Sequence, residues 1–317
     1  MIILLGSSGY VGSAFRELFD RKSIPYHGLS RRQVDYTNRS ALTAFLRDAK
    51  PTFLINAAGH TGKPNVDACE LQKADCLLGN AVLPGIIRDA CDTCSLPWGH
   101  VSTGCIYTGA RVGGAGFTEL DTPNFCFRTN NCSFYSGCKA VGEECLQGSQ
   151  QTYIWRLRIP FNHVDSARNY VSKLMRYHRL LDATNSLSHL NEFVAACCET
   201  WHRRVPFGTY NITNPGAIST REVVELIRRE LEPNRSFGFF EDETEFMSVA
   251  AKAPRSNCTM DSSKLLATGI PMTPVAEAMI HSLRHWVPET QLPGSTQENQ
   301  HSALAERKHR PIGFAFL

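Results

Sequence analysis

The chain has 317 residues, with 33 lysines and arginines against 30 aspartates and glutamates. This near balance argues against a nucleic-acid or polyanion partner, and no apolar run reaches the ~18 residues of a membrane span. The N-terminus lacks the basic flank and cleavage site of a signal peptide, so we expect a cytoplasmic protein without nucleic-acid or membrane partners.

The first half of the chain alternates short apolar runs with amphipathic helical patterns. Strands are expected at residues 2–5, 25–29, 52–56, 100–103 and 152–157, and helices at residues 13–21, 40–48 and 74–92. This alternation predicts an α/β fold, a Rossmann-like doubly wound parallel sheet with helices on both faces. The remaining segments predict a smaller C-terminal substrate lobe over the carboxyl ends of the strands, where open α/β sheets bind ligands.

The division into domains follows from the same pattern. Residues 1–160, with a late strand at about residues 208–214, are expected to form the Rossmann domain, and residues 161–207 and 215–287 the substrate-binding lobe. Residues 288–317 are rich in Gln, Ser, Pro and charge, which predicts a disordered tail without a catalytic role.

A glycine-rich turn follows the first predicted strand and precedes the first helix. Its glycines have GxxGxxG spacing, in the context that a dinucleotide fingerprint requires. Glycines let the backbone turn tightly and approach a pyrophosphate, and the helix N-terminus offers free N–H groups. The residues expected to contact a dinucleotide here are Gly6, Ser8, Gly9, Tyr10, Val11 and Gly12.

Two adjacent arginines, Arg31 and Arg32, follow the second predicted strand. An acidic residue at this place would hold the ribose hydroxyl of NAD, whereas arginine accommodates the 2′-phosphate of NADP. The sequence therefore favours NADP(H) as the cofactor. Further contacts are expected from Asp35 at the adenine edge and from the small residues that end the third strand, namely Asn56, Ala57 and Ala58.

The twelve cysteines are scattered along the chain, and in a cytoplasmic protein we expect them to be reduced and mostly buried. Cys91 and Cys94 form a CxxC pair, but no second pair or nearby histidine completes a zinc site. No metal is therefore expected.

Tyr135 and Lys139 lie four residues apart where a helical pattern begins. Residues with this spacing share one face of a helix, so the ammonium group would lie beside the phenol. A neighbouring cation lowers a tyrosine pKa from its usual value of ~10. Tyr135 is therefore a candidate proton donor or acceptor near neutral pH.

Four motifs together resemble the extended short-chain dehydrogenases/reductases: GxxGxxG, Asn-Ala-Ala-Gly at residues 56–59, Ser-Thr at 102–103 and Tyr-x-x-x-Lys at 135–139. Within that family, residues 56–70, 102–107, 121–125 and 253–257 are similar to enzymes that make nucleotide-linked rhamnose, most closely the bifunctional 3,5-epimerase/4-reductases. The resemblance covers roughly residues 1–285. It implies NADPH-dependent conversion of a nucleotide-linked 4-keto-6-deoxyglucose to nucleotide-linked rhamnose.

The resemblance also implies roles for individual residues. Thr103, Tyr135 and Lys139 would form the reductase triad, and Asn80 would support them at the cofactor. In this scheme Tyr135 protonates the C4 oxygen, Thr103 orients that oxygen, and Lys139 holds the cofactor ribose.

An epimerase step is implied by two further residues. Plain reductases of this group carry an Asp-Tyr pair where this chain has Gly104 and Cys105. In the bifunctional enzymes, this cysteine and the lysine that falls on Lys173 serve the epimerase. The chemistry is consistent, because a C4 ketone acidifies the C–H bonds at C3 and C5, and inversion needs one acid/base group on each face of the ring.

Three residues are expected at the substrate. Arg255 could clamp the diphosphate with its guanidinium or form a salt bridge between the domains, and the sequence leaves both open. Lys63 and Asn169 are the other candidates. The nucleotide, UDP or dTDP, stays open, and so does the oligomeric state, for which the resemblance suggests a homodimer.

Two rival functions stay open as well. A reductase without epimerase activity would receive an epimerised substrate, and Cys105 would then be an ordinary buried cysteine. A non-catalytic, NADP-binding regulatory subunit is the second rival, but such a protein would have no need of an intact Thr103, Tyr135 and Lys139.

Overall fold

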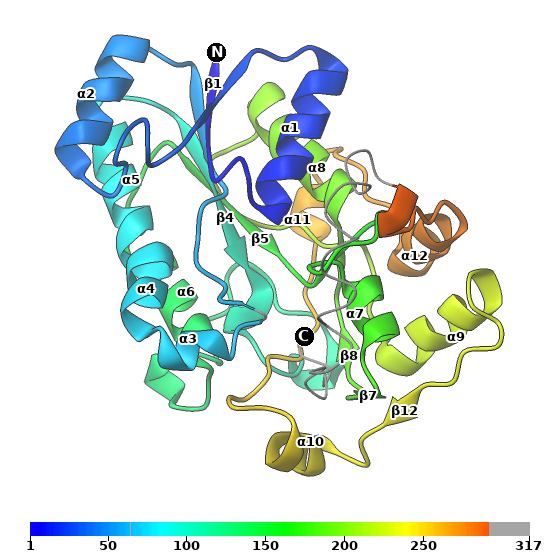
Figure 1. The fold of residues 1–317 in the computed structure, drawn as a ribbon. Coiled ribbons are helices and arrows are strands. Elements are labelled where there is room, and N and C mark those ends of the chain that lie inside the picture. Colours follow the sequence, from blue (N-terminus) through cyan, green and yellow to red (C-terminus); the bar gives the residue numbers. More distant parts are fainter. Residues whose placement is uncertain (64, 292–317) are drawn as a thin grey trace, which may run out of the picture.

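The computed structural model describes residues 1–63 and 65–291. Its centre is a parallel sheet in the strand order β10-β5-β4-β3-β1-β2, which confirms the predicted Rossmann-like fold (Figure 1). The strands are β1 (Ile2–Leu5), β2 (Tyr26–Leu29), β3 (Phe53–Asn56), β4 (Trp98–Thr103), β5 (Thr152–Leu157) and β10 (Gly208–Asn211). β10 pairs in parallel with β5, so the late strand returns to this sheet as predicted.

Helices cover both faces of the sheet. The main ones are α1 (Tyr10–Lys22), α2 (Arg39–Ala49), α5 (Leu83–Thr93), α6 (Phe134–Glu144) and α8 (Leu190–His202). Successive residues of a strand point to opposite faces: Leu4 of β1 joins the core beneath α1 and α8, whereas Ile3 and Leu5 join the core beneath α2 and α5. The two-sided burial explains why β1, with the sequence Ile-Ile-Leu-Leu, is apolar throughout.

The helix expected at residues 74–92 runs from Lys73 to Thr93 and contains a π-helical turn. α4 (Lys73–Leu77) leads into a π-helical turn at Leu78–Val82, and α5 follows. Pro84 stands in the first turn of α5, where its missing N–H cannot complete a helical hydrogen bond. The π-helical turn carries Asn80, and such turns are frequent at functional sites.

The second lobe consists of short elements around a core of its own. Its helices include α7 (Tyr170–Arg176), α9 (Thr220–Glu230), α10 (Glu243–Val249) and α12 (Val275–Arg284). Its two-stranded sheets pair β6 (Pro160–Phe161) with β9 (Ser188–His189), β7 (Arg179–Leu180) with β12 (Gly238–Phe239), and β8 (Thr184–Asn185) with β11 (Ile218–Ser219). The short helices α3 (Ala68–Leu71) and α11 (Ser263–Leu266) complete the fold.

The structure differs from the predicted domain limits at two places. α8 was assigned to the lobe, yet its buried face packs on α1 against the sheet, because an apolar helix face does not reveal its partner. Residues 292–317 of the predicted tail lie outside the described residues. Just before them, Glu289–Gln291 form a short 3-10 turn, and Glu289 pairs with Arg176 at 3.1 Å (Oε2 to Nη2).

Each helix in the described ranges is too short or too polar to cross a membrane.

Candidate active site

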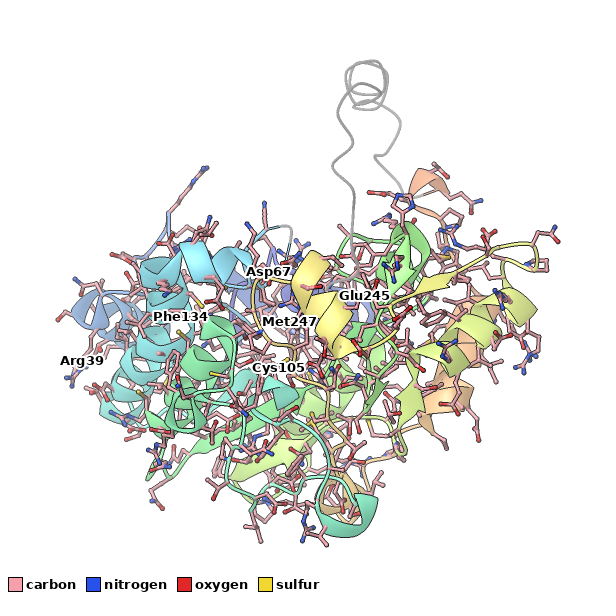
Figure 2. The ribbon with its side chains drawn as sticks, turned by 90° about the horizontal axis from the view of Figure 1, so that it is seen from below. Arg39, Asp67, Cys105, Phe134, Glu245 and Met247 are labelled. Carbon is pink, nitrogen blue, oxygen red and sulfur yellow. The ribbon has the colours of Figure 1, made fainter. Side chains whose placement is uncertain are left out.

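The predicted reductase residues meet at the carboxyl-terminal edge of the sheet, which Figure 2 views from below. Thr103 is the last residue of β4. α6 begins after Ser133, whose Oγ caps the helix by accepting a hydrogen bond from Ser136 N at 3.2 Å. Tyr135, in the first turn of α6, forms a side-chain hydrogen bond with Thr103.

Tyr135 and Lys139 do not interact as the sequence predicts. Burial raises the pKa of Tyr135, and electrostatic interactions with Cys105 and Cys69 raise it further. The expected lowering by Lys139 is wrong, because the Lys139 ammonium is directed to the Val101 carbonyl (Nζ to O, 3.1 Å), and burial lowers the pKa of this lysine to about 8. Tyr135 is therefore a phenol at neutral pH, the form that can donate a proton.

A buried ion pair that the sequence analysis missed lies beneath these residues. Arg156 of β5 and Glu143 of α6 approach to 2.7 Å (Nη2 to Oε2). Ser102 Oγ donates to Glu143 Oε1 at 2.5 Å, which ties the pair to β4. The charge of Glu143 also opposes the effect of burial on the pKa of Lys139. The sequence does contain a sign of a buried charge here, because Arg156 and Arg158 alternate at the end of an otherwise apolar strand.

Cys105 lies in a 3-10 turn at Gly104–Ile106, directly after β4. Its backbone N–H donates to Thr103 Oγ1 at 3.1 Å, and its Sγ accepts a hydrogen bond from Arg158 Nη1 at 3.0 Å. A Cβ at position 104 would come within 2.2 Å of Met260 Sδ and 3.2 Å of Arg158 Cδ. A side chain there would displace both residues, so this glycine and Arg158 belong to one arrangement.

Lys173 approaches the same site from α7 of the lobe. Burial, together with the positive charges of Arg168 and Arg255, lowers the pKa of Lys173 to about 8, and Cys105 opposes this shift. The fold thus brings Cys105 and Lys173, which are far apart in the sequence, into electrostatic contact.

Asn169, predicted to contact the substrate, is fully buried instead. Its Oδ1 caps α7 by accepting from Val171 N at 3.0 Å, and its Nδ2 donates to the carbonyl oxygens of Asn162 and Val164 at 2.9 and 2.7 Å. These bonds occupy the amide within the protein. Asn169 therefore fixes the start of the helix that presents Lys173 rather than offering a contact of its own.

Two amides expected at the cofactor also serve the backbone. Asn80 accepts from His60 N at 3.1 Å and donates to His60 O at 2.6 Å. Asn56, fully buried, accepts from Ala58 N at 3.0 Å, and its Nδ2 lies 3.0 Å from Nδ1 of His100. Burial lowers the pKa of His100 well below its usual range, so the neutral ring can accept this bond. Both amides hold the loop after β3, and the contacts of these two residues with a cofactor stay predictions.

Arg255 forms the salt bridge between domains that the sequence left open as an alternative. Its Nη1 lies 2.7 Å from Asp67 Oδ1 and its Nη2 donates to Asp67 Oδ2 at 2.8 Å, with both side chains buried. Arg168 adds a second link by donating to the carbonyl oxygen of Gly62 at 2.6 Å. Lys63 is exposed on the same loop, and its contact with a substrate stays a prediction.

The glycine-rich turn forms a close-packed cradle between β1 and α1. Gly6 has φ +74°, and a Cβ there would come within 2.5 Å of Ala58 N. A Cβ on Gly12 would come within 2.0 Å of Gly6 O. α1 starts after Gly9 without a side-chain cap, which leaves its first N–H groups available to an anion. These residues fit the pyrophosphate of a dinucleotide.

The other predicted cofactor residues surround this cradle. Arg31 and Arg32 are exposed after β2, where a 2′-phosphate could reach them. The carboxylate of Asp35 is engaged in a turn, accepting from Thr37 N and Oγ1 at 3.1 and 2.6 Å. The Tyr10 hydroxyl is directed to Ser166 of the lobe, and burial raises its pKa. The remaining predicted contacts, at Ser8, Val11 and Ala57, stay predictions.

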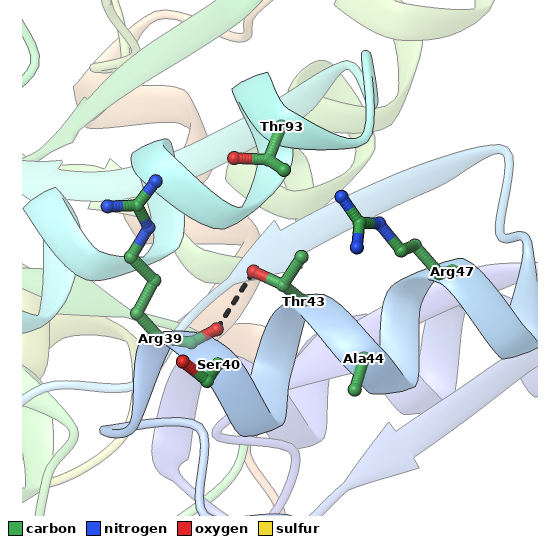
Figure 3. A pocket seen from close by; sticks show the side chains of 6 residues that line it. All are labelled: Arg39, Ser40, Thr43, Ala44, Arg47 and Thr93. Atoms are coloured by element: carbon green, nitrogen blue, oxygen red, sulfur yellow. Dashed lines mark hydrogen bonds between the residues drawn. The ribbon is translucent and has the colours of Figure 1, made fainter.

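A separate surface hollow lies on α2 and α5 (Figure 3). It is lined by Arg39, Ser40, Thr43, Ala44, Arg47 and Thr93. Figure 2 places Arg39 well away from Cys105, and the lining offers no acid/base pair, so we do not assign the reaction there. In the described part of the chain no cluster of His, Cys, Asp and Glu is placed to hold a metal ion.

The family model described as the RmlD substrate binding domain matches residues 1–287. A bifunctional dTDP-4-dehydrorhamnose 3,5-epimerase/dTDP-4-dehydrorhamnose reductase from Arabidopsis thaliana is 33% identical over 284 residues, which cover 88% of this chain and 90% of that protein. Three trifunctional relatives from the same plant match 88% of this chain, but the match spans only 41% of their length.

Two solved structures show the same fold. The L780 UDP-rhamnose synthase of Acanthamoeba polyphaga mimivirus superposes with a TM-score of 0.82 at 23% identity, covering 90% of this chain and 98% of that one. A dTDP-4-dehydrorhamnose reductase from Bacillus anthracis in complex with NADP gives a TM-score of 0.74 at 18% identity, covering 90% and 97%.

Proposed function

The chain belongs to the family of the RmlD substrate-binding domain and is an enzyme, a nucleotide-sugar reductase, and we propose that it also epimerises its substrate. In the proposed reaction a nucleotide-linked 4-keto-6-deoxyglucose is inverted at C3 and C5 and then reduced at C4 with NADPH, which gives nucleotide-linked rhamnose. The name of the 33% identical plant relative carries both activities, which supports the proposal.

The position of Cys105 is the observation that carries the proposal. It lies two residues beyond Thr103, and it interacts electrostatically with both Tyr135 and Lys173. One sugar ring could therefore reach the groups for both steps without leaving the site.

The epimerase step needs a base on one face of the ring and an acid on the other. Cys105 and Lys173 are the proposed pair. One of them removes the acidic proton at C3 or C5, which leaves an enolate conjugated with the C4 carbonyl, and the other returns a proton to the opposite face. The lowered pKa of Lys173, about 8, suits proton transfer near neutral pH.

The reductase step uses Thr103, Tyr135 and Lys139. Tyr135, held as a phenol by burial, donates its proton to the C4 oxygen. Thr103 hydrogen-bonds Tyr135 and would orient the same oxygen. Lys139 keeps most of its charge at neutral pH, although burial lowers its pKa to about 8, and it would hold the ribose of the cofactor.

NADPH is the proposed cofactor, and when bound it would supply the hydride for C4. The cradle at Gly6, Gly9 and Gly12 would hold its pyrophosphate, and Arg31 and Arg32 its 2′-phosphate. The NADP complex of the Bacillus anthracis reductase, which has the same fold, is consistent with this choice.

The proposal is tested by NADPH consumption with UDP- and dTDP-linked 4-keto-6-deoxyglucose in deuterated water, followed by NMR of the product. We expect a rhamnosyl product that carries deuterium at C3 and C5. NADPH oxidation without deuterium at these carbons would leave a reductase only. Absence of turnover with both nucleotides, from protein that binds NADPH, would contradict the catalytic proposal and favour the regulatory alternative.

A further inference from the structure

Arg158 is a buried cation with an unusual set of partners. It directly follows β5 and is 2% exposed. Its Nη1 donates to Cys105 Sγ at 3.0 Å, while its Nη2 donates to Asn185 Oδ1 at 2.5 Å and to the carbonyl oxygen of Ser256. Apart from the sulfur, these partners are neutral.

The other buried arginines have carboxylate partners. Arg156, two residues earlier, pairs with Glu143, and Arg255 pairs with Asp67. Arg158 has no carboxylate within ion-pair distance in the described part of the chain. A guanidinium keeps its charge in proteins, and a buried charge without an opposite charge is costly. The surroundings of Arg158 therefore favour an anion on one of its neighbours.

Two cysteines lie close enough to Arg158 to carry this negative charge, Cys105 and Cys258. Cys258 is 1% exposed. Its Sγ donates to the carbonyl oxygen of Gly104 at 3.4 Å. A thiol that donates keeps its proton, and burial raises the pKa of Cys258. Arg158 hydrogen-bonds both sulfurs. Because the Gly104 carbonyl holds Cys258 as a donor, Cys105 is the sulfur that can hold the charge.

The groups around Cys105 are consistent with a negative sulfur. Arg158 contacts it from the end of β5, Lys139 and Tyr135 face it from α6, and Lys173 faces it from α7. Three of these four groups are cationic when protonated. None of the four is a carboxylate that would compete with a thiolate for the positive charge.

We propose that Arg158 is a positioning residue that holds Cys105 as a thiolate directed at the substrate. This inference rests on the proposed epimerase function and assigns Cys105 as its base and Lys173 as its acid. The Cys105 thiolate accepts the proton from C3 or C5 and becomes a thiol, the C–H electron pair passes into the enolate, and the Lys173 ammonium gives its proton to the opposite face. Exchange with solvent then returns Cys105 to the thiolate and Lys173 to the ammonium.

The test compares the alkylation of Cys105 by iodoacetamide at pH 7 and pH 9.5 in the full chain, resolved by peptide mass spectrometry. An ordinary thiol, titrating near ~8.5, reacts about thirtyfold more slowly at pH 7. In wild-type protein we expect the two rates to agree within about threefold, because Arg158 already holds the thiolate. A thirtyfold difference in the wild type would overturn the proposal, and this readout needs no variant to fold.

Variants then assign the effect to Arg158. In Arg158→Gln we expect the ratio of the two rates to approach thirtyfold, and in Arg158→Lys, which keeps a cation, an intermediate ratio. The matched control is Cys258→Ser, which should keep the wild-type ratio. If Cys258→Ser changes the ratio while Arg158→Gln does not, Arg158 is not the positioning residue.

The inference and the proposed function can fail separately. Similar alkylation rates at the two pH values without deuterium exchange at C3 or C5 would support Arg158 as the thiolate partner and refute the epimerase. Deuterium exchange with a thirtyfold alkylation difference would support the epimerase and overturn the role of Arg158.

Discussion

The two candidate groups at the carboxyl edge of the sheet hold their lysines in opposite surroundings. Lys139 lies near the buried carboxylate of Glu143, which opposes the lowering of its pKa, whereas Lys173 lies near Arg168, which adds to the lowering. Cys105 opposes the pKa shift of both lysines. Both lysines have a pKa of about 8, mainly through burial. The reductase group therefore has a carboxylate near its lysine, while the epimerase group carries positive charge that a thiolate or an anionic substrate must offset.

The two groups also differ in where their residues come from. Thr103, Tyr135 and Lys139 lie on β4 and α6 of one domain. Cys105 follows β4, but Lys173 lies on α7 of the lobe, whose approach depends on contacts between the domains. The reductase group should therefore tolerate changes at the domain boundary better than the epimerase group does.

The largest expected effect is a separation of the two steps by Tyr135→Phe. Removing the phenolic proton donor should lower reduction at C4 by about 10²–10⁴-fold, the usual range for a general acid. Deuterium exchange at C3 and C5 should persist, because Cys105 and Lys173 remain. NADPH oxidation and NMR-detected exchange on the same sample measure the two steps.

The matched control is Cys105→Ala, which should do the reverse. It should abolish exchange but still reduce a 4-keto sugar that has already been epimerised. If both folded variants lose both activities to the same extent, the assignment of separate groups to the two steps is wrong.

A smaller effect is expected from Asp67→Asn, which breaks the buried bridge between the domains. The change removes the carboxylate that forms the buried ion pair with Arg255, so we expect a loss of about 3–5 kcal/mol in the free energy of unfolding, measured by urea denaturation. Because Arg255 also lies near Lys173, exchange at C3 and C5 should fall more than reduction does.

Glu199→Gln is the control for this variant. Glu199 forms an exposed i,i+4 pair with Arg203 at 2.7 Å, and such pairs contribute little to stability. The denaturation midpoint should stay near that of the wild type. An Asp67→Asn protein as stable as this control, or one in which both activities fall equally, would show that the bridge does not support the epimerase group in particular.

Sequence patterns predicted those parts of the site that are formed by residues close together in the chain. The glycine spacing at Gly6, Gly9 and Gly12 and the pair of Tyr135 and Lys139 on one helix follow from backbone geometry within a few residues. The parallel sheet follows likewise from apolar runs alternating with helical patterns. These predictions needed no knowledge of distant partners.

Partners that meet only in the folded chain could not be predicted from local patterns. The contact of Arg158 with Cys105 and the bridge of Arg255 to Asp67 join distant segments. Without those partners, Arg255 looked equally suited to a diphosphate, and the effect of burial on the pKa of Tyr135 could not be foreseen.

The bonding of the asparagine side chains could not be predicted for a related reason. An amide beside a motif looks the same in the sequence whether it faces a ligand or the backbone. Asn56, Asn80 and Asn169 all proved to hold loops or cap a helix. Their partners are backbone atoms, which leave no side-chain signal to read.

The smallest expected effect is a shift in the pH dependence of exchange. Lys173 must be an ammonium to donate its proton, and its pKa is about 8. Exchange at C3 and C5, measured by NMR without NADPH, should therefore fall as pH rises through about 8, by roughly tenfold per unit beyond it. Below that pH the ammonium is retained and loss of this proton no longer limits exchange.

Arg168→Met tests whether this pH dependence belongs to Lys173. Burial is the main cause of the lowered pKa and Arg168 the next, so removing this positive charge should raise the pKa of Lys173 and move the decline of exchange to higher pH. Arg168 is not among the groups that shift the pKa of Lys139, so the pH profile of reduction should stay in place. If both profiles move together, the two lysines share one electrostatic environment, and the contrast between a lysine near a carboxylate and a lysine near arginines fails.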